Sequence, residues 1–132
     1  MPLKTKSILA PKEQNDGLRI SIMSRHTLSD GTTPDPRITE DLFNRTMKEL
    51  APPPKLIGAY YKNGMTWSEF SARFDEHLAR PITQMWLEHL IRMARAGDVT
   101  IMCIEDTPEH CHRRLVAEAC SKIDPTLEII IK

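Results

Sequence analysis

An apolar run at residues 99–104, VTIMCI, limits the folds open to this chain more than any other segment. A continuous run of this kind is typical of a strand covered on both faces in the middle of a parallel sheet. A polar loop, EDTPEH, follows the run, and residues 111–121 then show a helical pattern. A buried strand that leads through a short loop into a helix is the repeating unit of α/β proteins.

Strand-like and helix-like patterns alternate along most of the chain. Leu18, Ile20 and Ile22 alternate with other residues as in a strand, and Thr66 with Glu69 forms a capping box that opens a helix. The expected elements, in order, are a strand at 18–24, a helix at 39–49, a strand at 55–61, helices from 66 and at 83–95, a strand at 99–104, a helix at 111–121 and a strand at 127–131. This order predicts a single α/β domain whose mainly parallel sheet of four or five strands is covered by helices on both faces.

The length of 132 residues suits one domain. The first 16 residues are polar and interrupted by Pro11, and they lack the apolar core of a signal peptide. We expect residues 1–16 to be a flexible N-terminal lead-in, with at most a short edge strand near Ile8. Residues 17–132 are expected to form the domain.

Charge and cysteine content exclude several classes of function. The 18 basic and 18 acidic side chains balance, which removes the general electrostatic reason to expect nucleic acid or an anionic membrane as a partner. No apolar run approaches the roughly 18 residues of a membrane helix. The three cysteines, an odd number, are crowded into the last third of the chain, unlike those of a disulfide-stapled secreted domain. We therefore expect a cytoplasmic protein.

The segment from Cys103 to Arg114, CIEDTPEHCHRR, carries most of the reactive side chains. It joins a predicted strand to a predicted helix, and ligands of open parallel sheets bind beyond the carboxyl ends of the strands. The free N–H groups of the helix start, together with Arg113, would favour an anion there. Ser24, Arg25 and Tyr60 follow or end other predicted strands and are expected at the same edge. The candidate ligand-binding residues are therefore Ser24, Arg25, Tyr60, Cys103 and Arg113.

Cys111 lies on the expected first turn of a helix beside His112, and a helix N-terminus and an imidazolium both lower the pKa of a thiol. Glu105, Cys111 and His112 are therefore the candidate catalytic residues. The plain structural interpretation remains open, in which Cys103 and Cys120 are buried apolar residues and the acidic residues cap the helix. A zinc site from Cys103, His110, Cys111 and His112 matches no standard ligand spacing, so we predict no metal and no cofactor.

The run Cys103-x-Glu105-x2-Pro108-x2-Cys111-His112-Arg113 resembles the hallmark of the bacterial domain-of-unknown-function family 488 (DUF488), in its shorter members. The resemblance extends over residues 16–120. It includes the strand GLRISIMSR at 17–25 and the helix pattern WSEFSARF at 67–74, although His26–Gly31 replaces the family's usual tryptophan-proline-arginine-glycine turn. The resemblance implies a compact α/β fold with an arginine-lined cleft and no established reaction.

Two functions follow as expectations, and the residues leave open whether the chain is an enzyme. In the first, the chain binds a small anionic ligand, phosphate- or nucleotide-like, at the carboxyl edge of the sheet. Arg25 and Arg113 then hold the anion, while Glu105, Cys111 and His112 act on the ligand or shape its site. In the second, the chain is a non-catalytic homodimeric interaction module, in which an ion pair between Glu105 and Arg113 is structural. A redox or metal-sensing thiol at Cys111 is a third alternative.

Overall fold

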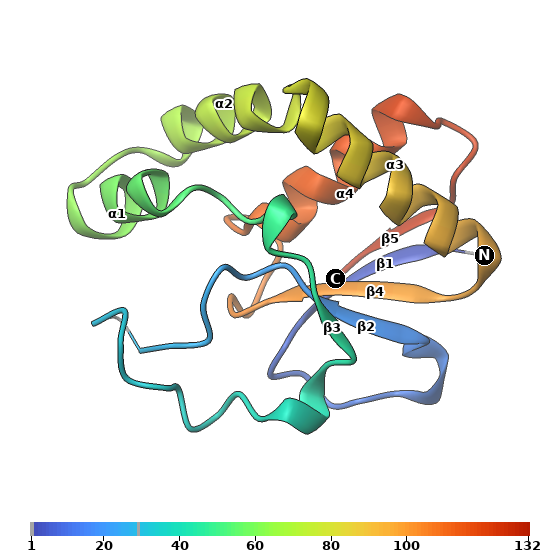
Figure 1. Ribbon diagram of the computed structural model, residues 1–132, viewed down its shortest axis with the longest axis horizontal. Helices are drawn as coiled ribbons and strands as arrows, with labels where there is room; N and C mark the ends of the chain where they lie inside the picture. Colours follow the sequence, from blue (N-terminus) through green and yellow to red (C-terminus); the bar gives the residue numbers. More distant parts are fainter. Residues whose placement is uncertain (1, 29) are drawn as a thin grey trace.

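A sheet of five parallel strands forms the centre of the computed structural model, which describes residues 2–28 and 30–132. The spatial order of the strands is β3-β2-β4-β1-β5 (Figure 1). Their bounds are Leu3–Ser7 for β1, Leu18–Ser21 for β2, Arg45–Thr46 for β3, Val99–Cys103 for β4 and Ile129–Ile131 for β5. The prediction of a single α/β domain with a mainly parallel sheet is confirmed.

The apolar run predicted to be a central strand is β4, which lies between β1 and β2. All five of its residues are buried. Thr5 of β1 and Ile20 of β2 flank Ile101 in register. Because parallel strands all end at the same edge, this register brings the residues after β2 and β4 together.

The first residues of the chain differ from the flexible lead-in that the sequence predicts. Residues Leu3–Ser7 form β1, which pairs with both β4 and β5. Leu3 is fully buried, and Lys6 is buried as well. Lysines rarely mark a buried strand, but Lys6 reaches two carboxylates, Glu13 and Asp16, and this pairing makes its burial tolerable.

The α-helices lie on one side of the sheet, with α1 (Pro54–Lys62) beyond the carboxyl ends of the strands (Figure 1). The others are α2 (Trp67–Leu78), α3 (Pro81–Ala96) and α4 (His112–Ile123). Side chains from α2, α3 and α4 share one hydrophobic core with Leu3, Ile20 and Ile101 of the strands. The sequence predicted α-helices on both faces, but among the described residues the opposite face carries only a short 3-10 turn, η1 (Gln14–Asp16). The Thr100 hydroxyl on that face of β4 donates a hydrogen bond to Asp16 O of η1.

Two further predicted elements are wrong. Residues 39–49 form no α-helix but two 3-10 turns, Glu40–Leu42 and Lys48–Leu50, on either side of the edge strand β3. Residues 55–61, predicted as a strand, belong to helix α1. Pro54 is the first residue of α1, where a missing N–H costs nothing, so the prolines that end one segment also start the next.

The helices expected from residue 66, at 83–95 and at 111–121 are present, as are strands within 18–24, 99–104 and 127–131. The Thr66 hydroxyl accepts a hydrogen bond from Glu69 N at 3.2 Å, as the capping box predicts. Within the described part of the chain, every helix is too short or too polar to cross a membrane.

Candidate functional site

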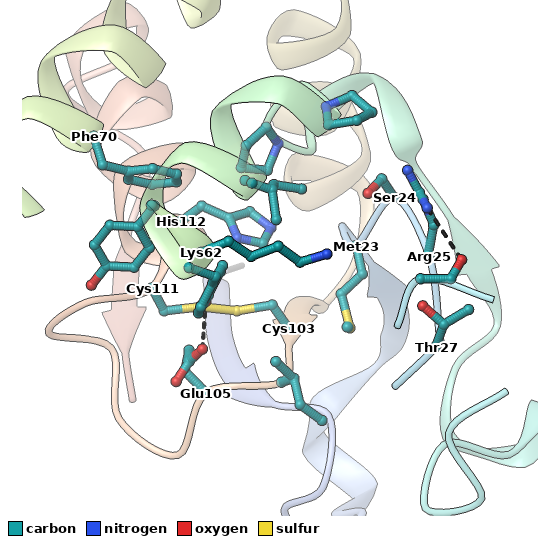
Figure 2. A pocket seen from close by; sticks show the side chains of 18 of the residues that line it. Met23, Ser24, Arg25, Thr27, Lys62, Phe70, Cys103, Glu105, Cys111 and His112 are labelled. Atoms are coloured by element: carbon teal, nitrogen blue, oxygen red, sulfur yellow. Dashed lines mark hydrogen bonds between the residues drawn. A yellow bond between two sulfur atoms is a disulfide. The ribbon is translucent and has the colours of Figure 1, made fainter. Parts of the chain in front are cut away.

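A cavity of about 510 Å³ opens at the carboxyl edge of the sheet, beyond the ends of β2 and β4 (Figure 2). Its walls come from the segment after β2, from α1, from the first turn of α2 and from the loop between β4 and α4. The principal lining residues are Met23, Ser24, Arg25, Thr27 and Leu28; Pro54, Ile57, Gly58, Tyr60, Tyr61 and Lys62; Trp67 and Phe70; and Cys103, Ile104, Glu105, His110, Cys111 and His112. The volume is sufficient for a small organic ligand.

The structure brings together seven of the eight candidate residues. Those that line the cavity are Ser24, Arg25, Tyr60, Cys103, Glu105, Cys111 and His112. Tyr60 reaches it from a helix rather than from the predicted strand end. Arg113 is the exception, because its side chain lies behind the cavity floor.

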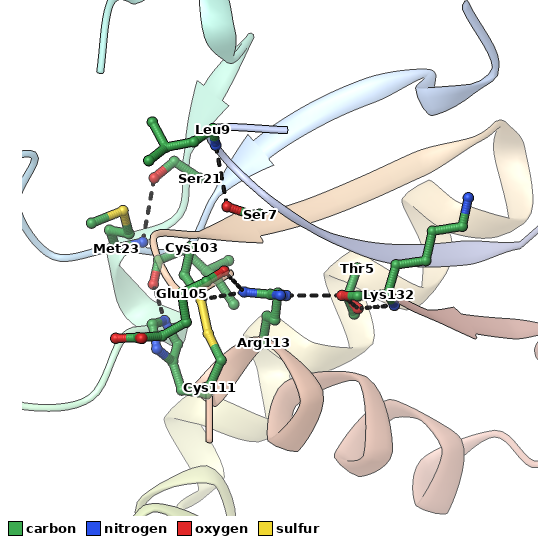
Figure 3. The surroundings of a disulfide bond; sticks show 12 residues. Thr5, Ser7, Leu9, Ser21, Met23, Cys103, Glu105, Cys111, Arg113 and Lys132 are labelled. Carbon is green, nitrogen blue, oxygen red and sulfur yellow. Dashed lines mark hydrogen bonds between the residues drawn. A yellow bond between two sulfur atoms is a disulfide. The ribbon is translucent and has the colours of Figure 1, made fainter. Parts of the chain in front are cut away.

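Cys103 and Cys111 form a disulfide on this floor (Figures 2 and 3). Cys103 ends β4 and Cys111 is the N-cap residue of α4, and both are buried. Burial of Cys103 agrees with the sequence analysis, whereas the bond between the two was not expected. The available signal was topological: a short loop from a strand to the following helix returns its two ends to the same edge of the sheet. A bonded Cys111 sulfur is not a thiolate, so nucleophilic attack by Cys111 requires prior reduction.

The third cysteine, Cys120, is separate from this pair. Its thiol is fully buried in the hydrophobic core on α4. Burial raises the pKa of the Cys120 thiol to about 12, which keeps it protonated and unreactive at neutral pH. The interpretation of Cys120 as a buried apolar residue agrees with this environment.

His112 is neutral in the folded protein. Burial lowers the pKa of its imidazole to about 4, against a smaller opposing effect of its hydrogen bond to Ile22 O at 2.7 Å. A neutral ring supplies no positive charge, so the expected activation of Cys111 by an imidazolium does not operate here. The contact with Ile22 O also ties the start of α4 to the end of β2.

Arg113 is fully buried and supports the loop between β4 and α4 from behind (Figure 3). Its guanidinium donates to Glu105 O at 2.8 Å, to Lys132 O at 3.2 Å and to Cys103 Sγ at 3.4 Å. The Glu105 carboxylate instead accepts a hydrogen bond from the Tyr61 hydroxyl at 2.5 Å. Partial burial and this carboxylate raise the pKa of Tyr61. Arg113 therefore holds the backbone of Glu105, and the side chain of Glu105 is left facing the cavity.

Two exposed cationic side chains stand at the cavity, Arg25 after β2 and Lys62 at the end of α1. Figure 2 shows the Lys62 ammonium directed across the cavity toward the segment that carries Met23 and Arg25. Arg25 donates one hydrogen bond to Gly31 O at 3.2 Å, which fixes the guanidinium at the rim. The sequence analysis missed Lys62 because it assigned residues 55–61 to a strand and not to a helix that continues to Lys62.

An aromatic wall faces these cations. The Trp67 and Phe70 rings stack at 5.2 Å, and Tyr60 lies 4.9 Å from Phe70. His110 stacks on the other part of the wall, 5.0 Å from Trp67. Trp67 and Phe70 are three residues apart on α2 and therefore lie on the same face of that helix. Both residues do pack on the core, and both also line the cavity.

Cations, a carboxylate, an aromatic wall and a sulfur pair thus share one concave site with the N-terminus of α4. No curated protein and no solved structure matches the chain. A family model does match it over residues 3–123, which is most of its length and includes every residue of the site. The chain belongs to the DUF488 family, and the matching model is that of the N3a subclade, described as the active DUF488-N3 subclade.

Proposed function

We propose that this chain binds a small anionic molecule, phosphate- or nucleotide-like, in the cavity at the carboxyl edge of the sheet. The observation that carries the proposal is the presence of Arg25 and Lys62 in the same cavity as the aromatic wall of Tyr60, Trp67 and Phe70. Guanidinium and ammonium groups bind phosphate, and aromatic faces stack on planar bases. The description of the matched subclade as active agrees with a site that its members use.

The cation set of this proposal differs from the one expected from sequence. The Arg113 guanidinium already donates hydrogen bonds to two backbone carbonyls. In this proposal Lys62 therefore replaces Arg113 as the second cation beside Arg25. The N-terminus of α4, a helix of 12 residues, adds a favourable potential at the cavity floor. Glu105 would repel an anion placed next to it. The phosphate therefore belongs at the rim between Arg25 and Lys62, and Glu105 is available as a hydrogen-bond acceptor or base for the rest of the ligand.

Binding is tested by tryptophan fluorescence, because Trp67 lines the cavity. The chain has two tryptophans, so the Trp86→Phe background leaves Trp67 as the sole reporter. Inorganic phosphate, adenosine and adenosine mono- and diphosphate are titrated separately. We expect a saturable signal with the nucleotides, and a dissociation constant raised about tenfold or more in Lys62→Ala, since a hydrogen bond to a charged group contributes about 1.5–3 kcal/mol.

The matched control is Lys55→Ala, which removes an exposed lysine of the same helix outside the cavity. It should bind as the background protein does. Equal weakening in Lys55→Ala and Lys62→Ala would show only a general effect of charge. No saturable signal with any of the nucleotides would contradict the proposal.

A non-catalytic homodimeric module is the second candidate, and one observation favours it. Ile82 and Met85 of α3 are 52% and 62% exposed on neighbouring turns, which is unusual for large apolar side chains. The structural use of Arg113 agrees with this candidate too. Sedimentation of the wild type and of Met85→Glu would decide it, because a dimer through α3 should dissociate in the variant while a monomer stays unchanged.

A further inference from the structure

The two sulfurs on the cavity floor have a third potential metal ligand beside them. Cys103 Sγ, Cys111 Sγ and a ring nitrogen of His112 all lie within 4.8 Å of one another. Figure 2 shows the His112 ring next to the sulfur pair. The imidazole that completes the group is that of His112, whereas His110, the other histidine of this loop, is exposed and stacks on Trp67.

The hydrogen bond of His112 prepares its ring for a metal ion. A carbonyl oxygen only accepts hydrogen bonds, so Nε2, 2.7 Å from Ile22 O, carries the proton. Nδ1 then keeps its lone pair. Histidines that bind metals commonly donate their other ring N–H to a backbone carbonyl or a carboxylate, because this contact fixes the tautomer and the ring orientation.

Two groups of the protein lie where they would stabilise the negative charge of metal-bound sulfurs. Arg113 Nη1 lies 3.4 Å from Cys103 Sγ as a donor. Cys111 is the N-cap residue of α4, where the helix dipole favours negative charge. Two thiolates and one imidazole form a soft ligand set of the kind that selects zinc among the abundant divalent ions.

We propose that the reduced chain binds one Zn²⁺ through Cys103, Cys111 and His112, with its fourth coordination position open to the cavity. All three residues line that cavity. Three protein ligands with one open position distinguish reactive zinc sites from closed structural ones. The site is independent of the anion proposed above, since the metal is held by protein groups alone.

Reduction comes first and supplies the electrons. Two molecules of a small thiol convert the Cys103–Cys111 disulfide into two cysteine thiols and are themselves joined as a disulfide. Zn²⁺ then replaces the two thiol protons, which leave to solvent. The same three residues thus hold a disulfide under oxidising conditions and a metal ion under reducing ones.

Cobalt(II) is the spectroscopic probe for this site. The metal-free chain is reduced with a phosphine, which avoids competing thiols, and is titrated with Co²⁺. We expect one equivalent to produce thiolate-to-cobalt charge-transfer absorption and the intense visible bands of a tetrahedral ion, and one equivalent of Zn²⁺ to abolish both. The oxidised chain, identical in sequence, should show neither.

Three variants separate the site from incidental thiol binding. Cys111→Ser should lose the charge-transfer band, His112→Ala should bind Co²⁺ at least about tenfold more weakly, and Cys120→Ser should behave as wild type. Circular dichroism reports whether each variant folds. A reduced wild type without the bands would overturn the proposal, as would bands that persist in Cys111→Ser or an unchanged affinity in His112→Ala.

Discussion

His112 and Arg113 are neighbours in sequence, yet their side chains lie on opposite sides of the cavity floor. Successive residues of an α-helix point about 100° apart, so three consecutive residues at a helix start cannot all face one ligand. His112 faces the cavity, whereas Arg113 points behind the loop toward Glu105 O and Lys132 O. A sequence motif therefore marks a folded unit, and only part of it needs to touch a ligand.

Loss of the Arg113 side chain should destabilise the protein strongly. In Arg113→Ala, Glu105 O loses the donor that a buried guanidinium now provides, and Lys132 O keeps only the Thr5 hydroxyl; each lost hydrogen bond costs about 1–3 kcal/mol. We expect the free energy of unfolding in urea to fall by about 3 kcal/mol. Arg113→Lys should restore little, because an ammonium lacks the planar fork that reaches both oxygens.

Arg92→Ala is the matched control for Arg113, since Arg92 is an exposed arginine of α3. Its free energy of unfolding should stay within about 0.5 kcal/mol of wild type. If Arg113→Ala were equally mild, the hydrogen bonds of Arg113 to Glu105 O and Lys132 O would contribute little to stability, and Arg113 would be free to serve a ligand as the sequence analysis expected.

At the scale of elements, the sequence correctly predicted the helices whose apolar residues follow one buried face. The helices α2, α3 and α4 are of this kind, whereas strand β4 was predicted from a continuous apolar run, and all five of its residues are buried. Helix α1 was mistaken for a strand because KLIGAYY is equally compatible with both periods, and β1 was missed because Lys6 is buried by pairing with carboxylates. Most residues of the candidate site were nevertheless predicted correctly. Six of its residues were found because parallel strands share a carboxyl edge. Tyr60 was placed there through a predicted strand that is in fact helix α1, and Lys62, at the end of that helix, was missed.

Gly58 tests the helical assignment of α1. A glycine inside a helix costs roughly 0.5–1 kcal/mol relative to alanine, and a Cβ at Gly58 would meet no atom within 4 Å. Gly58→Ala should therefore raise the free energy of unfolding by about that amount. A decrease would mean that residues 54–62 are not helical in solution.

Gly17 is the natural contrast to Gly58. Its φ of +65° is one that residues with a Cβ rarely adopt, and a Cβ there would collide with Asp98 backbone atoms. Gly17→Ala should lower the thermal midpoint, opposite in sign to Gly58→Ala. Two identical chemical changes thus have opposite expected effects, set only by the backbone at each site.

At the scale of the whole molecule, the sheet separates an apolar half from a charged one. The face under the α-helices holds the hydrophobic core, and the other face buries Lys6, Asp16 and Arg19 as a connected group. Asp16 is its centre, since it accepts hydrogen bonds from Glu13 N at 2.9 Å, from Lys6 at 3.1 Å and from Arg19. Without Asp16, two buried cations would lose their shared counter-ion.

This charged group should make the protein sensitive to acid. Burial alone would raise the pKa of Asp16, but the Glu13 N–H, Lys6 and Arg19 outweigh it and hold the pKa below its usual 3.8. A carboxyl group with a lowered pKa in the folded state stabilises that state above its unfolded pKa, and the stabilisation is lost as the pH falls through the folded value.

At pH 7, Asp16→Asn should reduce the free energy of unfolding by about 3–5 kcal/mol. Below about pH 4 the difference between the wild type and the variant should begin to shrink in urea titrations and should continue to shrink as the pH falls, with Asp75→Asn on the exposed face of α2 as control for the lost charge. A difference that stays constant from pH 7 to pH 2 would show that Asp16 acts through packing and not through its charge.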